Sequence, residues 1–126
     1  MGYHMTQRDS RFRLPRCHFK AALVAVRQLL SAPIYAYPDN PSKQRSLPRV
    51  LRELGWEVEQ DAKTGDITSI LFIGEKAHED LELFKVLAPF VKARSFIAMD
   101  GEDGCLWRWW FNGQSVSEQY GHVVYK

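Results

Sequence analysis

The sequence predicts an α+β domain in which helices cover one face of a mainly antiparallel sheet. The chain has 126 residues, of which 45% are hydrophobic and 25% are charged. This composition suits one compact core and excludes disordered, collagen-like and low-complexity chains. Segments with strand-like alternation lie near both ends and in the middle of the chain, and segments with helical periodicity separate them. Because there is no internal repeat and no break in composition, residues 1–126 are predicted to form a single domain.

The N-terminal third contains one predicted strand, one predicted helix and a long loop. Residues 11–14 alternate charged and hydrophobic side chains, which predicts a half-buried strand with its two hydrophobic residues inward. Upstream the alternation changes phase, so we expect a bulge near residues 8–10. Residues 16–30 are rich in alanine and repeat apolar side chains at helical spacing, which predicts a helix with one packed face. Three prolines interrupt residues 31–45, which predicts a loop.

The middle of the chain predicts a short helix followed by a hairpin. Ser46 is placed as the N-cap of this helix, and Gly55 is placed as its stop. Residues 56–59 and 67–73 both alternate in the manner of strands. The turn between them contains a glycine, which is typical of a hairpin connection.

The last third predicts one more helix and three strands. Residues 77–91 have helical periodicity, with acids near the start and bases after the end, as the helix dipole favours. Pro89 should end the regular helix near residue 87 or 88. The strands are predicted at residues 95–99, 105–111 and 116–125. Without the small helix and the last two strands, the order is βαββαβ, the arrangement of ferredoxin-like domains.

The C-terminal hairpin carries most of the tryptophans. Its two strands are separated by Asn112-Gly113, a strong signal for a two-residue loop, which would place Trp109 opposite Val116. The predicted core face carries Trp107, Trp109, Phe111, Val116 and Tyr120. Arg108 and Trp110 fall on the opposite, polar face. Either these two form a surface cation–π pair with no further role, or they anchor a binding partner, since tryptophan and arginine dominate interface hot spots.

Chemically active groups are few and scattered. Cys17 and Cys105 form no CxxC pair, so both are predicted to be reduced thiols. Cys17 adjoins His18 at a predicted helix start, which favours a thiolate, but no further group completes a nucleophilic site. The turn at residues 100–104 holds three carboxylates, yet it lacks the ligand spacing of a calcium hand and is typical of an ordinary tight turn. We therefore predict no catalytic residue, no metal site and no cofactor.

Charge is unevenly distributed, although the formal net charge is only +2. Residues 1–52 carry ten basic and two acidic side chains, whereas residues 53–126 carry seven basic and thirteen acidic side chains. Such an imbalance is typical of chains that meet an anionic partner. The candidate anion-binding residues are Arg11, Arg13 and Arg16. In the alternative, the two halves interleave in the fold and their charges mix on one surface.

The sequence predicts a cytoplasmic location and no membrane partner. No apolar run approaches the length of a membrane helix. Residues 1–16 hold four arginines and no apolar block, which is unlike a secretory signal. Reduced cysteines are consistent with the same compartment.

Three stretches resemble small hypothetical proteins of bacterial and phage genomes. They are Gly2–Phe12, Phe72–Lys76, and Gly101–Gly104 together with Trp107-Arg108-Trp109. The resemblance covers most of the chain and is weakest in the proline-rich loop. It implies an accessory role in a mobile element, such as that of an immunity protein or an inhibitor, and it carries over no activity, substrate or catalytic residue.

Together these features predict a non-catalytic protein-binding module, either a monomer or a homodimer, that uses the C-terminal aromatic hairpin. The candidate protein-binding residues are Arg108, Trp110, Tyr35 and Tyr37. The alternative is a nucleic-acid or polyanion binder that uses the N-terminal arginines. A small enzyme of unrecognised class comes third, because no catalytic motif is present.

Overall fold

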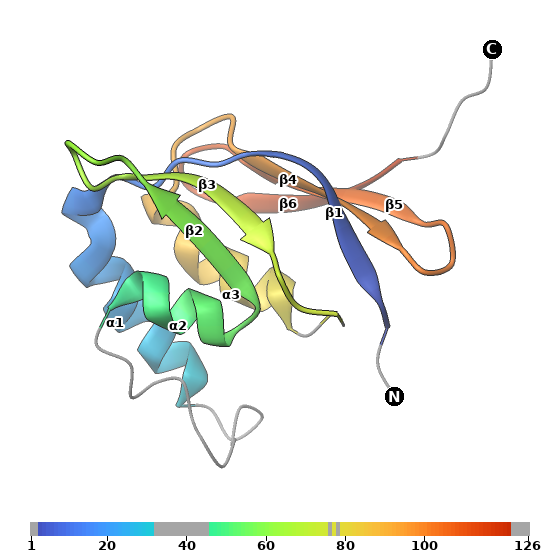
Figure 1. Cartoon of the computed structure of the whole chain (residues 1–126), viewed down its shortest axis with the longest axis horizontal. Helices are drawn as coiled ribbons and strands as arrows, with labels where there is room; N and C mark the ends of the chain where they lie inside the picture. The colour runs from blue at the N-terminus through green and yellow to red at the C-terminus, as the bar shows by residue number, and fades with distance from the viewer. Residues whose placement is uncertain (1–2, 32–45, 76, 78, 122–126) are drawn as a thin grey trace.

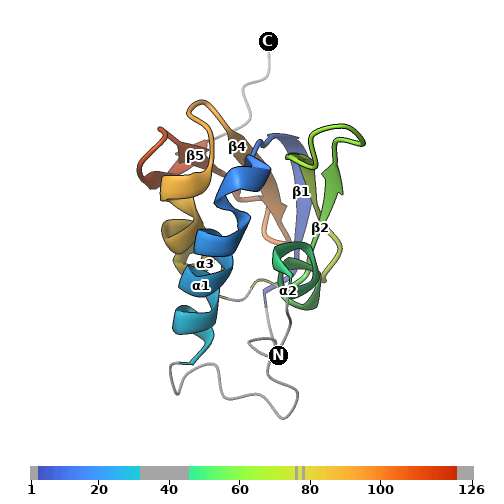
Figure 2. The ribbon, with the colours of Figure 1, turned by 90° about the vertical axis from the view of Figure 1, so that its left-hand side faces the viewer.

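The computed structural model describes residues 3–31, 46–75, 77 and 79–121. In these residues the strands are β1 (Met5–Arg11), β2 (Trp56–Gln60), β3 (Ile67–Phe72), β4 (Phe96–Gly101), β5 (Leu106–Phe111) and β6 (Val116–Gly121). The α-helices are α1 (Phe19–Leu30), α2 (Leu47–Glu53) and α3 (Asp80–Leu87), and two short 3-10 helices are η1 (Arg16–His18) and η4 (Ala88–Phe90). The strands form one layer and the helices pack beneath it (Figures 1 and 2). The predicted α+β class is confirmed.

The strands belong to a four-stranded sheet of order β1-β4-β5-β6 and a two-stranded sheet of β2 and β3, both antiparallel. Between β1 and β3 the side-chain amide of Gln7 takes the place of a backbone ladder. Its Nε2 donates to the carbonyl of Ile70, and its Oε1 accepts from the N–H of Phe72, both at 2.9 Å. The ferredoxin-like arrangement, which requires one continuous sheet, therefore stays a prediction.

The N-terminal strand lies earlier in the chain than predicted. β1 ends at Arg11, where the pairing with β4 ends, and the expected bulge is confirmed between Gln7 and Asp9. Phe12 and Leu14 are buried as predicted, but they lie outside the strand. The reason is that the chain leaves β4 at this point, and Leu14 exchanges both of its backbone hydrogen bonds with Ile67 of β3.

The helices follow the predicted positions with shorter regular segments. The first turn of the predicted helix at residues 16–30 is the 3-10 helix η1. Ser46 caps α2 as predicted, because its Oγ accepts from the N–H of Arg49 at 3.4 Å. Gly55 ends this helix with a φ of +96°, a value that L side chains adopt only with strain. The regular part of α3 ends at Leu87, directly before the turn with Pro89, as expected.

Trp56 lies at the centre of the core. Its side chain is fully buried, and its ring centroid lies 4.9 Å from that of Phe72, 5.1 Å from that of Phe84 and 6.0 Å from that of Trp109. The indole Nε1 donates to Oδ1 of the buried Asp80 at 3.0 Å. Trp56 thus joins both sheets to α3.

The predicted register of the C-terminal hairpin is wrong by two residues. Phe111 pairs with Val116 and Trp109 pairs with Glu118, so four residues, 112–115, form the loop. The cause is the side chain of Asn112, whose Oδ1 accepts from the N–H groups of residues 114 and 115 at 2.9 and 2.7 Å. Because side chains alternate with a period of two, a shift of two residues keeps every side chain on its predicted face.

Candidate functional site

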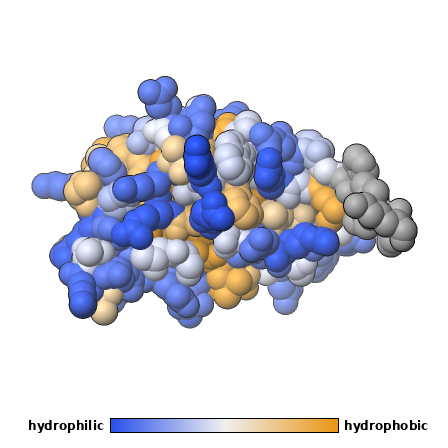
Figure 3. Space-filling model, turned by 90° about the horizontal axis from the view of Figure 1, so that it is seen from above, coloured by the Kyte–Doolittle hydropathy of each residue, from blue (hydrophilic) through white to orange (hydrophobic). Residues whose placement is uncertain are grey.

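The outer face of the four-stranded sheet, away from the helices, is the first candidate site. Seen from this side, the surface mixes hydrophilic side chains with hydrophobic patches (Figure 3). Cross-strand pairing places Arg11 of β1 beside Phe96 of β4, and Phe96 beside Trp110 of β5. Arg108 lies two residues before Trp110 on the same face, as predicted. We call these four residues the arginine–aromatic row.

The side chains of this row are stacked against one another. The rings of Phe96 and Trp110 are nearly parallel, at 14°, with centroids 6.3 Å apart. The guanidinium of Arg108 lies 4.8 Å from the centroid of Trp110, and that of Arg11 lies 6.0 Å from the centroid of Phe96. Arg108 also donates from Nε to Oε1 of Gln119 on β6 at 2.7 Å, which holds its guanidinium over the indole. The Trp110 ring therefore has a guanidinium over it and the Phe96 ring beside it.

The row has an excess of positive charge. Arg8 forms a salt bridge of 3.0 Å with Asp100 on the same side of the sheet. Within residues 3–31, 46–75, 77 and 79–121, neither Arg11 nor Arg108 has a carboxylate at salt-bridge distance. Their guanidinium groups are thus held by rings and an amide and keep hydrogen-bond donors for a ligand.

The structure separates the predicted anion-binding residues. Arg11 joins the row with Arg108 and Trp110, but Arg13 and Arg16 turn to the β2–β3 hairpin. The guanidinium of Arg13 binds Oδ2 of Asp66 at 3.0 Å, and the backbone N–H of Arg16 donates to Oδ1 of Asp66 at 2.8 Å. The three arginines therefore do not form one anion site, and Tyr35 and Tyr37 lie outside the described residues.

Sequence reasoning missed Phe96 as a member of this face, and it grouped Arg8 with the other N-terminal arginines without its partner Asp100. The pairing of β4 with β5 depends on where the turn between them begins and ends, and turn residues 102–105 are compatible with more than one register. The alternation within residues 95–99 indicated on which face of the sheet Phe96 lies. It did not indicate that Trp110 is the neighbour of Phe96 on β5.

The carboxylates of the β2–β3 turn should make stability depend on pH. The backbone N–H of Arg16, followed by the guanidinium of Arg13, lowers the pKa of Asp66 below its usual value of 3.8. The backbone N–H groups of Thr64 and Lys63 likewise lower the pKa of Asp61. A carboxylate whose pKa is lower in the folded state stabilises the fold above its unfolded pKa, and the effect is lost as pH falls through the folded pKa.

We therefore expect the midpoint of urea unfolding to fall as pH decreases from about 5 to about 2. Asp66→Asn should be less stable than the wild type near neutral pH and should approach it at the acid end. Arg13→Ala should change the profile in the same direction but less, because the Arg16 N–H is the larger cause. Parallel profiles for Asp66→Asn and the wild type would contradict this assignment.

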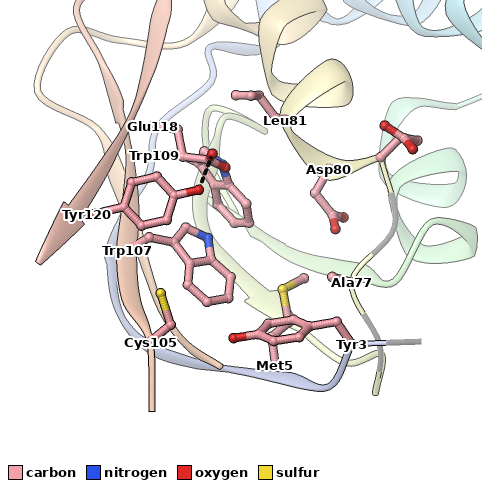
Figure 4. Close-up of a pocket in the computed structure, with 11 residues that line it drawn as sticks. Tyr3, Met5, Ala77, Asp80, Leu81, Cys105, Trp107, Trp109, Glu118 and Tyr120 are labelled. Atoms are coloured by element: carbon pink, nitrogen blue, oxygen red, sulfur yellow. Dashed lines mark hydrogen bonds between the residues drawn. The ribbon is translucent and has the colours of Figure 1, made fainter. Parts of the chain in front are cut away.

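A second candidate site is a pocket of about 300 Å³ on the helix side of the same sheet, which we call the aromatic pocket. Its lining residues are Tyr3, Met5, Ala77, Glu79, Asp80, Leu81, Cys105, Trp107, Trp109, Glu118 and Tyr120. The strands β1, β5 and β6 and the start of α3 supply most of these residues, and Tyr3, Ala77 and Cys105 lie outside the helices and strands (Figure 4). In the close-up, the rings of Trp107 and Tyr3 lie on one side and the carboxylate of Asp80 lies across from them.

Hydrogen bonds fix three of the aromatic walls. The hydroxyl of Tyr3 donates to Oδ1 of Asp103, and this bond raises the pKa of Tyr3 to about 12. Glu118 accepts from Trp109 Nε1 at 2.9 Å on Oε1 and from the Tyr120 hydroxyl at 2.7 Å on Oε2. Tyr120 is 69% exposed, so this bond holds a side chain that would otherwise turn freely in solvent.

The remaining chemically active residues do not assemble into a catalytic site. Cys17 is exposed and Cys105 is partly exposed at the edge of the aromatic pocket, and neither is in a disulfide. In the part of the chain that the structure describes, no group of three or more His, Cys, Asp or Glu side chains is placed to hold a metal ion.

No family model, curated protein or solved structure matches this chain. The resemblance to small bacterial and phage proteins therefore stays a prediction. Among the residues with described positions, no helix is both long enough and apolar enough to span a membrane.

Proposed function

We propose that this chain is a non-catalytic protein-binding module whose contact surface is the outer face of the four-stranded sheet. The observation that carries the proposal is the arginine–aromatic row. It presents Trp110 and Arg108, residue types that dominate interface hot spots, on a sheet face with no helix over it.

The same geometry argues against single-stranded nucleic acid as the ligand. Proteins that bind such strands stack successive bases on the open faces of aromatic rings. Here the guanidinium of Arg108 lies 4.8 Å from the centroid of the Trp110 ring and is held there by its bond to Gln119, so it occupies a position where a base would stack. A base would have to displace the guanidinium, whereas a protein partner can contact the ring edges and the arginine donors as they stand.

The charge of the face indicates which protein surface it fits. Arg11 and Arg108 keep donors without a described carboxylate partner, and a planar guanidinium binds a carboxylate through two parallel hydrogen bonds. The proposed partner therefore carries acidic residues around an apolar centre that covers Trp110. An immunity protein or an inhibitor, the role to which the resemblance points, would act through such a surface.

The test uses the partner that the wild-type chain retains from extracts of its source cells, purified and measured by calorimetry. Arg108→Glu and Arg11→Glu should each weaken binding at least about tenfold, because each places a carboxylate against an acidic surface. Arg49→Glu is the matched control. Arg49 is exposed on α2, in the helix layer, and its change should leave affinity unaltered.

Two results would overturn the proposal. One is full affinity in both Arg108→Glu and Trp110→Ala. The other is binding to heparin or single-stranded DNA that weakens steeply with salt and is lost in Arg11→Glu, because that result would assign the face to a polyanion.

We further propose that the chain keeps a ferredoxin-like βαββαβ core to which β5 and β6 add a hairpin. The support is the Gln7 amide, which joins β1 to β3 where that core has neighbouring central strands. Such a core leaves one sheet face free of helices, as the proposed contact surface requires.

A further inference from the structure

We propose that the aromatic pocket binds a methylated ammonium cation, a nitrogen that carries methyl groups and a full positive charge. Aromatic ring faces together with negative charge are the features that recognise such cations. The pocket has both, and it lies on the opposite side of the sheet from the arginine–aromatic row. The inference is therefore independent of the proposed protein-binding function.

The rings that line the pocket form angled walls rather than a closed stack. The centroids of Tyr3 and Trp107 are 6.0 Å apart with an angle of 46° between the rings. Trp107 and Trp109 are also 6.0 Å apart, at 78°. Tyr120 supplies a fourth ring beside them (Figure 4). The half-buried rings of Tyr3 and Trp107 form a corner, with Trp109, 3% exposed, behind it. A cation in this corner contacts more than one ring, so the cation–π attractions add.

The charge of the pocket favours a cation. Its described lining residues include three carboxylates, Glu79, Asp80 and Glu118, and no lysine, arginine or histidine. An anionic ligand would meet repulsion from the carboxylates of Glu79 and Glu118.

The hydrogen bonds of the carboxylates favour a methylated ammonium over a primary one. Both oxygens of Glu118 already accept hydrogen bonds, one from Trp109 and one from Tyr120. Oδ1 of Asp80 accepts from Trp56. A primary ammonium must satisfy three N–H donors, and three of the four oxygens of Glu118 and Asp80 already accept one hydrogen bond each. A methylated nitrogen needs only charge and apolar contact, which the carboxylates and the rings supply.

The volume of about 300 Å³ is at the lower end for small-molecule sites, which span roughly 300–1,000 Å³. A pocket of this volume suits a methylated ammonium group that carries a short chain. Two sources share this chemistry: a free small molecule such as choline, and a trimethylated lysine side chain on another protein.

The first experiment is a titration of the full chain with tetramethylammonium chloride at constant ionic strength, followed by NMR shifts of the indole N–H groups. We expect saturable shifts of the Trp107 and Trp109 signals and little change at Trp110. Neopentyl alcohol has a similar shape and no charge, and it should shift these signals much less. Equal responses to the two probes, or to sodium chloride alone, would overturn the proposal.

Variants of the lining residues test the site itself. Glu118→Gln and Trp107→Ala should each weaken tetramethylammonium binding about tenfold, because one removes charge and the other removes a wall. If Trp107→Ala does not fold, Tyr120→Ala replaces it, since that side chain is mostly exposed. Trp110→Ala is the matched control and should bind like the wild type. Unchanged affinity in Glu118→Gln and in the wall variant would overturn the assignment.

The source of the cation is then distinguished with choline and with a short peptide that carries trimethyl-lysine. A peptide that binds more tightly than both choline and its own unmethylated form indicates a lysine side chain. The reverse order indicates a free small molecule. Loss of the protein partner in Arg108→Glu with intact ammonium binding would show that the two sites act separately.

Discussion

Replacing Trp56 with alanine should lower the free energy of unfolding by about 5 kcal/mol, the largest loss expected for a single substitution in this chain. Truncating a buried tryptophan costs about 3–5 kcal/mol, because the transfer free energy is lost and a cavity remains. Trp56 is fully buried among three aromatic rings. The change also removes the Nε1 donor from the buried carboxylate of Asp80, which adds the cost of a lost charged hydrogen bond.

Urea unfolding followed by circular dichroism measures this loss. Trp56→Phe is the matched variant, because it keeps an aromatic ring and removes only the donor and part of the volume. It should lose about 2 kcal/mol, less than half of the alanine loss. A loss below about 2 kcal/mol for Trp56→Ala would contradict the central position of this ring. Domains of this kind are stable by about 5–15 kcal/mol, so a largely unfolded Trp56→Ala variant is consistent with the prediction.

Local periodicity was sufficient to predict the helices and the strands from β2 onward, but not the position of β1. The alternation around Trp56 and Ile67, and the helical spacing before Leu30, reflect which side chains each element buries. The Ser46 cap and the Gly55 stop were predictable because each acts on backbone groups a few residues away. Such signals lie entirely within a short window of sequence.

Long-range pairing was less predictable. The chain leaves β4 after Arg11 because Leu14 pairs with Ile67, more than fifty residues away in the sequence. In the sequence pattern, Gln7 is an ordinary polar residue of an edge strand. In the structure, its side-chain amide joins the two sheets. In the C-terminal hairpin, the side chain of Asn112 overrode the two-residue loop that Asn-Gly favours.

The candidate site was predicted only in part, because its residues lie on different strands and their contacts depend on long-range pairing. Arg108 and Trp110 share a strand, so their common face follows from alternation alone. That Arg11 and Phe96 join them follows only from the pairing of β1, β4 and β5. The separation of Arg13 and Arg16 from Arg11 depends on Asp66, in a turn that the sequence does not place beside them.

Trp109 and Trp110 are adjacent in the sequence and should respond very differently to truncation. Trp109 is 3% exposed, its ring centroid lies 5.0 Å from that of Phe84, and its Nε1 donates to Glu118. Trp109→Ala should therefore cost about 3–5 kcal/mol of unfolding free energy. Trp110 is half-buried, and Trp110→Ala loses its stacking on Phe96 and its contact with Arg108, so it should cost about 1–2 kcal/mol.

Chemical denaturation of the two variants under the same conditions measures the difference, and Trp110→Phe serves as a control that keeps an aromatic ring in the row. Equal losses, or a larger loss for Trp110→Ala, would mean that the sheet buries the face on which the protein-binding proposal rests. A small loss at Trp110 means that folding does not require an indole at that position. A contact residue can contribute little to folding and still bind a partner strongly, as expected for a tryptophan beside an arginine and a phenylalanine on an open sheet face.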